Sequence, residues 1–372
     1  MRTVLSIVGT RPEAIKMAPV IKELERHPKH IRSVVCSTGQ HREMLDQVLG
    51  MFQITPERDL NLMTPNQSLA ELTARLFSAV DEVLADVRPD CVLAQGDTTT
   101  VFVAAVASFY RAIPFGHVEA GLRTGDKRRP FPEEINRRLA DAVGDLFFPP
   151  TERGRQALLG EGVPDRDIYV TGNTVIDALL EVAEMEYDWA SGPLAAVPSD
   201  KRLVLITAHR RESFGEQFRE LCRAIRDLAQ AYEREGIHFV YPVHLNPNVR
   251  APVGEILSDI PNVSLIEPVD YLTLVQLMKR STIILTDSGG IQEEAPTFGV
   301  PVLVLRDMTE RPEGVDAGVA TLVGTTRSRI VEEASRLLVN PAERAKMRAR
   351  TNPYGDGKAA QRIVSAILER IP

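Results

Sequence analysis

The fold is decided first by residues 69–100, which read LAELTARLFSAVDEVLADVRPDCVLAQGDTTT. Leucine and valine recur at three- and four-residue steps from Leu69 to Leu84, which predicts an amphipathic helix that ends before Pro89. The short apolar run Cys91–Ala94 follows and predicts a buried strand, and the polar residues after it lead into another helix. A helix, a strand and a helix in succession are typical of an α/β fold with a parallel sheet.

The same alternation extends in both directions from this segment. Short apolar runs bounded by Gly, Asp or Pro recur in both halves of the chain, with helical patterns between them. The second half repeats the first, so we predict an α/β protein with two Rossmann-like domains. The expected strands are Val4–Val8, Val34–Cys36, Cys91–Ala94, Phe115–Val118, Leu146–Phe148 and Ile168–Val170 in the first half, and Leu203–Ile206, Phe239–Tyr241, Val263–Ile266, Ile283–Leu285 and Val302–Leu305 in the second.

Length and composition agree with two ordinary globular domains. At 372 residues the chain exceeds the roughly 100–200 residues that one hydrophobic core usually serves. A polar, proline-containing stretch after Trp189 interrupts the periodicity and predicts a linker. We therefore expect an N-terminal domain at 1–190, a C-terminal domain at 191–357 and a last helix at 358–372. Apolar residues line one face of that helix, so it requires a neighbouring surface to cover it.

Charge and cysteine content exclude several classes of function. The formal net charge of −7 argues against a nucleic-acid-binding surface, so an anionic ligand would require a local basic site. No apolar run approaches the roughly 18 residues of a membrane helix. Cys36, Cys91 and Cys222 show neither disulfide nor metal-ligand spacing. We expect a cytoplasmic protein that binds neither nucleic acid nor a membrane.

Three acidic residues are expected to converge on one edge of the first sheet. Asp97 follows the strand at Cys91–Ala94, Glu119 follows the next strand, and Glu133 begins a predicted helix. Carboxylates held close together in a cleft raise one another's pKa, which suits general acid and base catalysis. A metal site is the weaker use, because no histidine stands at ligand spacing from them. Taken singly, an acid such as Asp97 is better explained as a helix cap.

Basic and glycine-containing segments in both halves are candidates to hold an anion. Arg11 and Lys16 follow the first strand, although solvated cations on a surface loop are the alternative. The segment Asp287-Ser288-Gly289-Gly290 follows a strand of the second half and opens a helix, where backbone amides could bind phosphate or merely form a plain cap. Arg311 adds forked donors for phosphate oxygens, and Glu294 could accept both hydroxyls of a ribose.

Together these strings resemble the non-hydrolysing UDP-N-acetylglucosamine 2-epimerases. The match runs in order along nearly the whole chain, so it is far more specific than any one motif. It implies two domains that face a central cleft, the GT-B-like fold shared with many glycosyltransferases, in a homodimer whose last helix crosses back to the first domain. The strings are Gly-Thr-Arg-Pro-Glu-Ala-Ile-Lys from Gly9, Gly-Asp-Thr-Thr-Thr from Gly96, Gly-His-Val-Glu-Ala-Gly-Leu-Arg from Gly116, Pro-Glu-Glu from Pro132, His-Arg-Arg-Glu from His209, Asp-Ser-Gly-Gly-Ile-Gln-Glu-Glu from Asp287 and Asn-Pro-Tyr-Gly-Asp-Gly from Asn352.

The resemblance also implies roles for individual residues, with UDP-N-acetylglucosamine and UDP as ligands and no metal or cofactor. Asp97, Glu119 and Glu133 would surround the sugar as catalytic residues, with His209 as a further catalytic candidate. A second, activating substrate molecule would bind in segments that contain Gln40, Gln67, Arg210 and His244. UDP would be held by Arg11, Lys16, His209, Ser288, Gly289, Gly290, Glu294 and Arg311.

The expected reaction is inversion at C2 of UDP-N-acetylglucosamine to give UDP-N-acetylmannosamine. No carbonyl acidifies the C2 hydrogen, so UDP must leave C1 to make that hydrogen removable, which gives 2-acetamidoglucal, and UDP then adds back. Which acid serves which face of C2 stays open. A hydrolysing epimerase is the nearest alternative, although its relatives often carry Arg where Thr98 stands. A glycosyltransferase would need an acceptor pocket, and a silent nucleotide-sugar sensor should have lost the acids.

Overall fold

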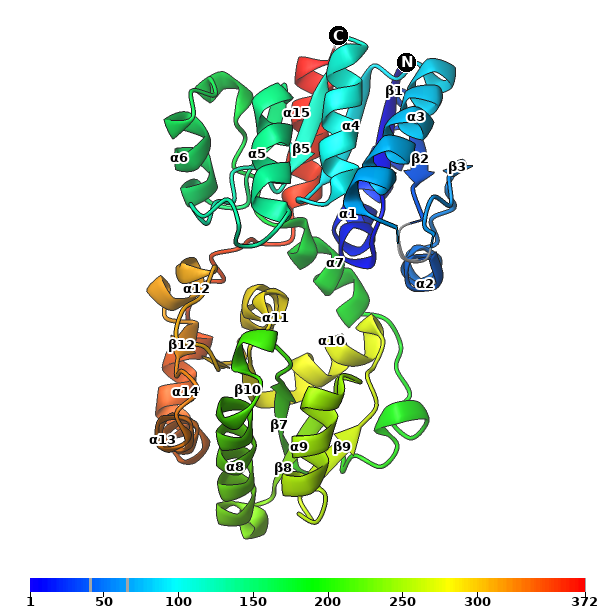
Figure 1. Ribbon diagram of the computed structural model, residues 1–372. Coiled ribbons are helices and arrows are strands. Elements are labelled where there is room, and N and C mark those ends of the chain that lie inside the picture. The colour runs from blue at the N-terminus through cyan, green and yellow to red at the C-terminus, as the bar shows by residue number, and fades with distance from the viewer. Residues whose placement is uncertain (40–41, 65–66, 372) are drawn as a thin grey trace. The chain divides into compact units, whose positions relative to one another are not determined.

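The computed structural model describes residues 1–39, 42–64 and 67–371 of the chain. The chain folds as two compact units, unit 1 at Met1–Ala178 with Tyr354–Pro372 and unit 2 at Leu179–Pro353, shown in Figure 1. Each unit contains one six-stranded sheet in which all strand pairs are parallel. The predicted α/β fold with two Rossmann-like domains is therefore confirmed. Among the described residues, no helix combines the length and the apolar character needed to cross a bilayer.

Unit 1 has the doubly wound strand order β3-β2-β1-β4-β5-β6. Its strands are β1 (Arg2–Val8), β2 (Ile31–Ser37), β3 (Arg58–Asp59), β4 (Cys91–Gln95), β5 (Phe115–Val118) and β6 (Leu146–Phe148). Its helices are α1 (Arg11–Glu25), α2 (Arg42–Met51), α3 (Leu69–Val87), α4 (Thr99–Tyr110), α5 (Glu133–Val143), α6 (Glu152–Gly160), η1 (Asp165–Asp167) and α15 (Ala359–Arg370), and α7 (Thr174–Ala183) contains the boundary between the units.

Unit 2 repeats this order, because β12-β11-β10-β7-β8-β9 is the same winding read from the other edge. Its strands are β7 (Arg202–Thr207), β8 (Ile237–Pro242), β9 (Val263–Ile266), β10 (Ser281–Thr286), β11 (Val302–Val304) and β12 (Ala320–Leu322). Its helices are η2 (Gly192–Leu194), η3 (Arg211–Ser213), α8 (Glu216–Ala231), η4 (Glu233–Glu235), α9 (Pro247–Leu257), α10 (Tyr271–Arg280), α11 (Gly289–Glu294), η5 (Ala295–Phe298), α12 (Pro312–Asp316), α13 (Arg327–Val339) and α14 (Pro341–Arg348).

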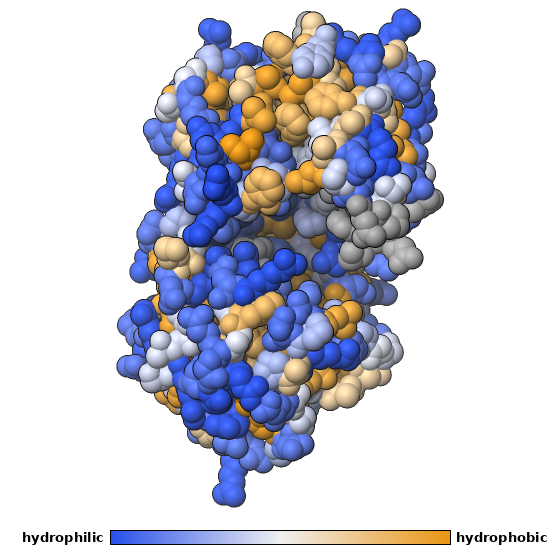
Figure 2. All heavy atoms as spheres, viewed as in Figure 1, coloured by the Kyte–Doolittle hydropathy of each residue, from blue (hydrophilic) through white to orange (hydrophobic). Residues whose placement is uncertain are grey.

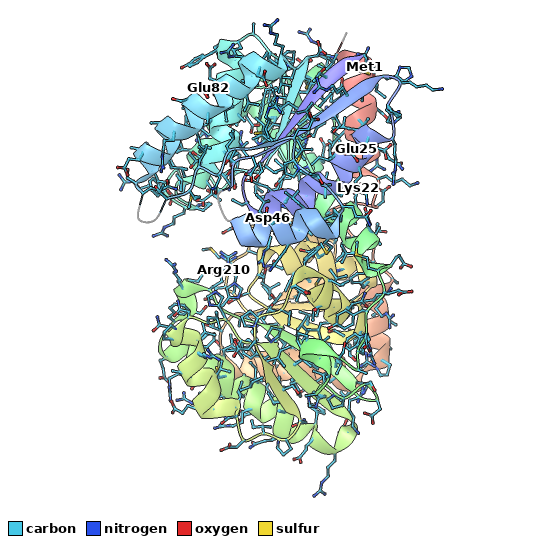
Figure 3. All side chains as sticks on the ribbon, turned by 90° about the vertical axis from the view of Figure 1, so that its right-hand side faces the viewer. Met1, Lys22, Glu25, Asp46, Glu82 and Arg210 are labelled. Carbon is cyan, nitrogen blue, oxygen red and sulfur yellow. The ribbon has the colours of Figure 1, made fainter. Side chains whose placement is uncertain are left out.

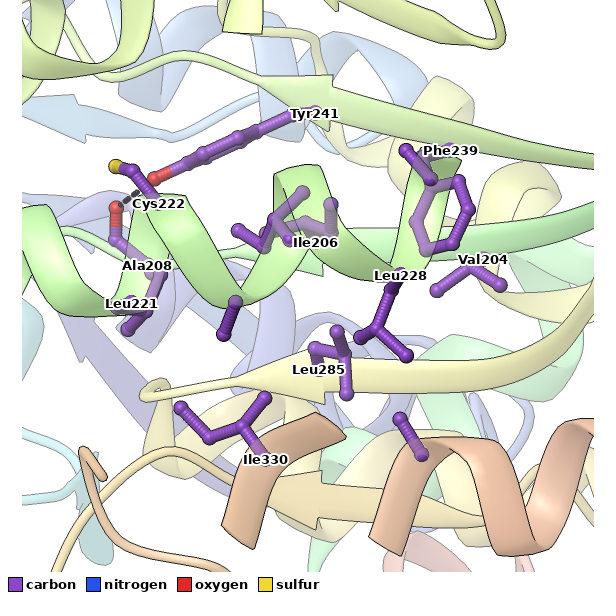
Figure 4. Close-up of a cluster of buried hydrophobic side chains, with 14 of the residues drawn as sticks. Val204, Ile206, Ala208, Leu221, Cys222, Leu228, Phe239, Tyr241, Leu285 and Ile330 are labelled. Atoms are coloured by element: carbon purple, nitrogen blue, oxygen red, sulfur yellow. Dashed lines mark hydrogen bonds between the residues drawn. The ribbon is translucent and has the colours of Figure 1, made fainter. Parts of the chain in front are cut away.

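Each sheet buries its apolar side chains against helices that carry an apolar stripe. In α8 the buried residues Phe218, Leu221, Ile225 and Leu228 recur at three- and four-residue steps, so one face of the helix covers the sheet (Figure 4). Full burial of one such side chain contributes roughly 1.5–3 kcal/mol. Within the same core the Tyr241 hydroxyl donates to the Ala208 carbonyl at 2.6 Å, which ties the end of β7 to β8.

The last helix, α15, is covered by unit 1. Its first two amides, from Ala359 and Ala360, donate to the Asp177 carboxylate at 3.2 and 2.9 Å, so Asp177 caps α15 from a distant part of the chain. Arg2 donates to the Leu368 carbonyl at 2.9 Å near the other end of the helix. The apolar face of α15 is thereby buried against neighbours such as α1.

The predicted strand at Ile168–Val170 is wrong. Only Ile168 pairs, as an isolated bridge to Phe147, although the Tyr169 amide still donates to the Phe147 carbonyl at 2.8 Å. The segment runs beside β6 at the edge of the sheet, and Val170 is 42% exposed. An apolar run at an edge can follow the last strand without forming a ladder of its own. The short strands β3 and β12 were not expected, because two or three residues are too few to show an alternation of apolar and polar side chains.

Candidate active site

The strand order of each unit determines where its candidate residues gather. In unit 1 the winding reverses between β1 and β4, and in unit 2 it reverses between β7 and β10. A doubly wound sheet binds its ligand beyond the carboxyl ends of the strands at this switch point. The segments that follow these four strands, from Gly9, Gly96, Ala208 and Asp287, carry most of the residues proposed from the sequence.

Asp97 lies just beyond β4 and is held from α5. Arg137, whose side chain is only 5% exposed, pairs with the Asp97 carboxylate at 2.5 Å. Asn136 donates to the Asp97 carbonyl at 3.0 Å, so both the side chain and the backbone of Asp97 are oriented by adjacent residues of one helix. Asp97 does not cap α4, because the cap position belongs to Thr98. The position of the Asp97 carboxylate is therefore explained by its contacts with α5 and not by helix capping.

Glu119 follows β5 with a backbone φ of 67°, in the left-handed region that a residue with a side chain rarely adopts. Such a conformation costs on the order of 1–3 kcal/mol and persists only when the surroundings hold it. Its amide donates to the Phe148 carbonyl at 3.0 Å, and its carboxylate accepts hydrogen bonds from Lys16 and Gln95. Within unit 1, the Lys16 ammonium thus forms an ion pair with Glu119, a candidate residue of the sugar site.

Glu133 is the first residue of α5, three and four residues before Asn136 and Arg137. Residues at this spacing share one face of a helix, so Glu133 lies on the face of α5 that contacts Asp97. Its Oε2 atom is buried and has no hydrogen-bond partner among the described parts of the chain. A buried carboxylate oxygen in this state is costly unless a ligand or a proton satisfies it.

The loop between β1 and α1 is organised by a buried residue that the sequence analysis did not single out. Glu13 Oε2 accepts from the amides of Gly9 at 2.6 Å and Thr10 at 3.0 Å, which forms a capping box at the start of α1. Burial raises the pKa of Glu13 to about 7, against the lowering effect of the nearby Thr98 hydroxyl and of these two hydrogen bonds. Arg11 is exposed at the first turn of the same helix.

In unit 2, His209 and Arg210 are positioned by a single carboxylate. Asp287, which follows β10 and is 1% exposed, accepts from both of their backbone amides at 2.7 Å. The His209 ring stacks on His244 with ring centres 5.2 Å apart and planes 14° from parallel. Burial lowers the pKa of His209, and the charges of His244 and Arg210 act in the same direction against Asp287. A neutral imidazole at the carboxyl end of β7 can accept as well as donate a hydrogen bond.

Arg210, which is labelled in Figure 3, lies close to Gly289 of the glycine-containing segment. Ser288 is the cap residue of α11, and its amide donates to the Thr286 hydroxyl at 2.9 Å. A side-chain carbon added at Gly289 would lie 3.9 Å from the Arg210 guanidinium, whereas one added at Gly290 would lie 3.3 Å from Glu294. Backbone amides and a guanidinium therefore occur together at this strand end, which is the chemistry that an anion requires.

Two ligand candidates of unit 2 are held by partners that sequence reasoning did not identify. The Tyr271 hydroxyl donates to Glu294 Oε2 at 2.9 Å, and burial together with Glu294 raises the pKa of Tyr271, so that hydroxyl keeps its proton. Arg311 forms an ion pair with Glu293, whose side chain is 4% exposed. Of these adjacent acids, Glu293 thus orients the ligand candidate Arg311, and Glu294 is itself a ligand candidate.

The candidates for an activator site are divided between the units. Gln67 contacts Arg75 and Thr64 in unit 1, whereas Arg210 and His244 belong to unit 2. Gln40 lies outside the described residues.

Besides Glu13, sequence reasoning missed the contact residues Gln95, Asn136, Arg137, Tyr271 and Glu293. Glu293 stands directly beside Glu294 in the motif that begins at Asp287, and Gln95 directly precedes the motif that begins at Gly96, so their positions were a usable signal. Asn136 and Arg137 follow Glu133 at helical spacing, which also indicates a shared face. Tyr271 offers no such signal, because its partner is 23 residues away.

Comparison with known proteins adds a family to this geometry. The sequence model described as UDP-N-acetylglucosamine 2-epimerase matches residues 22–368. The UDP-N-acetylglucosamine 2-epimerase of Escherichia coli (strain K12) is 54% identical over 370 residues, which cover 98% of each chain. The crystal structure of UDP-GlcNAc 2-epimerase from Neisseria meningitidis, bound to UDP-GlcNAc, has a TM-score of 0.88 at 50% identity and covers 99% of this chain and 100% of that chain.

A more distant structure supports the fold alone. The glycotransferase of kitacinnamycin is 13% identical, has a TM-score of 0.64 and covers 100% of this chain and 99% of that chain. The predicted glycosyltransferase-type, GT-B-like fold class is therefore confirmed.

Proposed function

The chain belongs to the UDP-N-acetylglucosamine 2-epimerase family of isomerases, and on this premise we propose that it interconverts UDP-N-acetylglucosamine and UDP-N-acetylmannosamine without hydrolysing them. The observation that carries the proposal is the grouping of Asp97 and Glu133 about one face of α5, with Glu119 beyond the neighbouring strand β5. Inversion at C2 needs one group that removes a proton and another that returns one, and carboxylates in a shared site can do both.

The reaction that we propose begins with departure of UDP. The C1–O bond breaks with its electron pair going to the diphosphate, and the positive charge that develops at C1 acidifies the C2 hydrogen. A carboxylate takes that proton, and the C–H electron pair becomes the C1=C2 double bond of 2-acetamidoglucal. A second carboxylate then protonates the opposite face of C2 while a UDP oxygen attacks C1. The first carboxyl group then releases its proton to solvent and the second takes one up, so that protons, electrons and UDP balance over the cycle.

Different residues are proposed for the proton transfers and for the leaving group. Glu133 is the strongest candidate for proton exchange, because its buried Oε2 lacks a partner among the described residues. Asp97 and Glu119 are paired with the cations Arg137 and Lys16, respectively. Each acid or base contributes roughly 10²–10⁴-fold to the rate.

We propose that the diphosphate is bound at the switch point of unit 2. Arg311 supplies positive charge there, with the amides beyond Ser288 as further donors. His209, whose pKa is lowered by burial, would donate one hydrogen bond to the leaving group or the uridine. Glu294 is oriented by Tyr271 and can accept from the ribose hydroxyls. Arg11 and Lys16 of unit 1 complete the proposed ligand set.

The activator site and the assembly are finer proposals. Arg210 and His244 lie beside the UDP candidates, which favours a second substrate molecule binding next to the first. We also propose a homodimer, because exposed apolar side chains gather over α4 and α5 of unit 1 (Figure 2). These exposed residues include Phe109, Tyr110, Ile135 and Leu139. The three buried thiols, none of them in a disulfide, suit a reducing cytoplasm.

The experiment is incubation of the protein with UDP-N-acetylglucosamine alone in heavy water, followed by NMR. Elimination and re-addition predict both epimers, each with deuterium at C2, and no need for an acceptor. Product that keeps its original C2 hydrogen would contradict the route. Free N-acetylmannosamine would instead identify a hydrolysing epimerase, and turnover only after addition of an acceptor would identify a transferase.

A further inference from the structure

His117 connects the elements that carry the candidate carboxylates. It lies in β5, two residues before Glu119, and its side chain is 0% exposed. One ring nitrogen contacts Asp141, which belongs to α5, and the other contacts the carbonyl of Gly96, directly before Asp97. A single buried ring therefore touches β5, α5 and the end of β4.

The partners of the ring determine how many protons it carries. Nε2 lies 2.7 Å from the Gly96 carbonyl oxygen, which can only accept, so Nε2 must carry a hydrogen. Nδ1 lies 2.6 Å from Asp141 Oδ1. The other oxygen of that carboxylate accepts from Arg123 at 2.7 Å and from the Gly121 amide at 3.3 Å, as an ionised carboxylate does. Although burial raises it, the pKa of Asp141 is lowered overall by His117 and Arg123, so this carboxylate is ionised. Nδ1 therefore donates as well, and the ring is an imidazolium.

The charges around this ring balance one another. Asp141 faces the imidazolium from α5, and Arg123, on the far side of Asp141, is itself paired with Glu161 at 2.7 Å. Burial alone would lower the pKa of His117, but Asp141 and the Gly96 carbonyl outweigh it and Arg123 opposes them only in part, so that pKa is raised. His117, Asp141, Arg123 and Glu161 alternate in charge along this chain, and Arg138 approaches Glu161 at its outer end, 3.7 Å away.

The backbone that the imidazolium holds leads directly to Asp97. Gly96 has a φ of 89°, which glycine tolerates and other residues rarely adopt. Its amide donates to the Val118 carbonyl at 3.0 Å while its own carbonyl accepts from His117, so β5 holds Gly96 at both polar groups. On the other side of Asp97, Asn136 holds the next carbonyl. Rotation of the peptide plane between Gly96 and Asp97 would move the Asp97 carboxylate.

We propose that His117 is a positioning residue which, as a permanent imidazolium, fixes the peptide between Gly96 and Asp97 and so aims the Asp97 carboxylate. The proposal rests on the proposed epimerase function, because it assigns to His117 the alignment of one of its acids. His117 itself exchanges no proton with the substrate, since both of its ring hydrogens are engaged by protein acceptors.

Two amide substitutions separate the two contacts of the ring. The amide nitrogen of His117→Asn can replace Nδ1 and keep the bond to Asp141, whereas that of His117→Gln can replace Nε2 and keep the bond to Gly96. We expect kcat to fall at least about tenfold in the Asn variant, with KM little changed, and to stay within about threefold of the parent in the Gln variant. His238→Asn, at a buried histidine of unit 2 that contacts Ser264 at 2.7 Å, is the matched control and should keep its kcat.

Equal kcat in the two amide variants would overturn the proposal. If His117 had a purely structural role, loss of its bond to Gly96 would affect kcat no more than loss of its bond to Asp141. Thermal unfolding identifies a variant that fails to fold. Ring ¹H–¹⁵N NMR of the parent tests the protonation state of His117 independently of the variants' kinetics. The His117 signals are assigned as those that are absent from the spectrum of the Gln variant. We expect both ring nitrogens to stay protonated at about pH 8, above the ordinary histidine pKa. An unprotonated ring nitrogen would refute the imidazolium. Lack of turnover by the parent would instead reject the proposed function and leave the NMR result readable.

Discussion

Replacement of Glu13 by Gln should remove a pH dependence from the stability of unit 1. The buried carboxyl group of Glu13 accepts from Gly9 and Thr10, and its pKa is raised to about 7 from an ordinary value of 4.5, mainly by burial. In Glu13→Gln the amide oxygen can accept the same two hydrogen bonds, and the amide nitrogen can donate to the Thr98 hydroxyl. The substitution therefore keeps the shape and the contacts while it removes the ionisation.

The magnitude follows from the difference between the folded and unfolded pKa values. The folded state holds the Glu13 proton up to about pH 7, whereas the unfolded chain releases it above pH 4.5. Stability that Glu13 provides in its protonated form is therefore present below pH 4.5 and is lost as pH rises to about 7. A difference of about 2.5 pH units at about 1.36 kcal/mol each corresponds to about 3 kcal/mol. The Gln variant should gain about that much relative to the parent between pH 4 and 8.

The assay is urea unfolding of the parent and the variant at a series of pH values, followed by circular dichroism. Trp189, the single tryptophan, belongs to unit 2, so its fluorescence reports a unit that the substitution should not affect. Glu25→Gln removes the same charge from an exposed position of the same helix and is the matched control (Figure 3). A difference between parent and Glu13→Gln that stays within about 0.5 kcal/mol from pH 5 to 8, as for an ordinary surface substitution, would refute the reasoning.

Four further substitutions test the site and the core. The Asp97→Asn and Glu133→Gln variants should bind UDP nearly as well as the parent in calorimetry. Their epimerisation rate, measured by NMR, should fall at least about a hundredfold, which is the loss typical of a removed acid or base. Near-parental turnover in both variants would show that Asp97 and Glu133 have structural roles only. Arg311→Ala should weaken UDP binding at least about tenfold, with turnover of the parent unaffected by excess chelator; abolition by chelator would instead require a metal. Tyr241→Phe should lower the urea stability of unit 2 by about 1–3 kcal/mol, because the buried Ala208 carbonyl loses its donor, and unchanged Trp189 fluorescence midpoints would contradict this.

Much of the fold was predictable because its signals are local. The amphipathic period from Leu69 to Leu84 and the apolar run at Cys91–Ala94 reflect contacts with the layer directly above or below, and both elements formed as expected. The prediction failed at Ile168–Val170 because an apolar run at a sheet edge can pack without pairing. Strand order, by contrast, depends on which loops cross over which strands, and no local pattern encodes that.

The candidate site divides in the same way. From the sequence alone one can select Asp97, Glu119 and Glu133 and expect them at strand ends, because residues after parallel strands share one edge of the sheet. Only the tertiary structure pairs Asp97 with Arg137, 40 residues away, and encloses His117 between Asp141 and Gly96. The reason is physical: hydrophobic periodicity is a property of neighbouring residues, whereas the protonation and aim of a buried charge depend on acceptors and counter-charges that only the folded chain brings within hydrogen-bond distance.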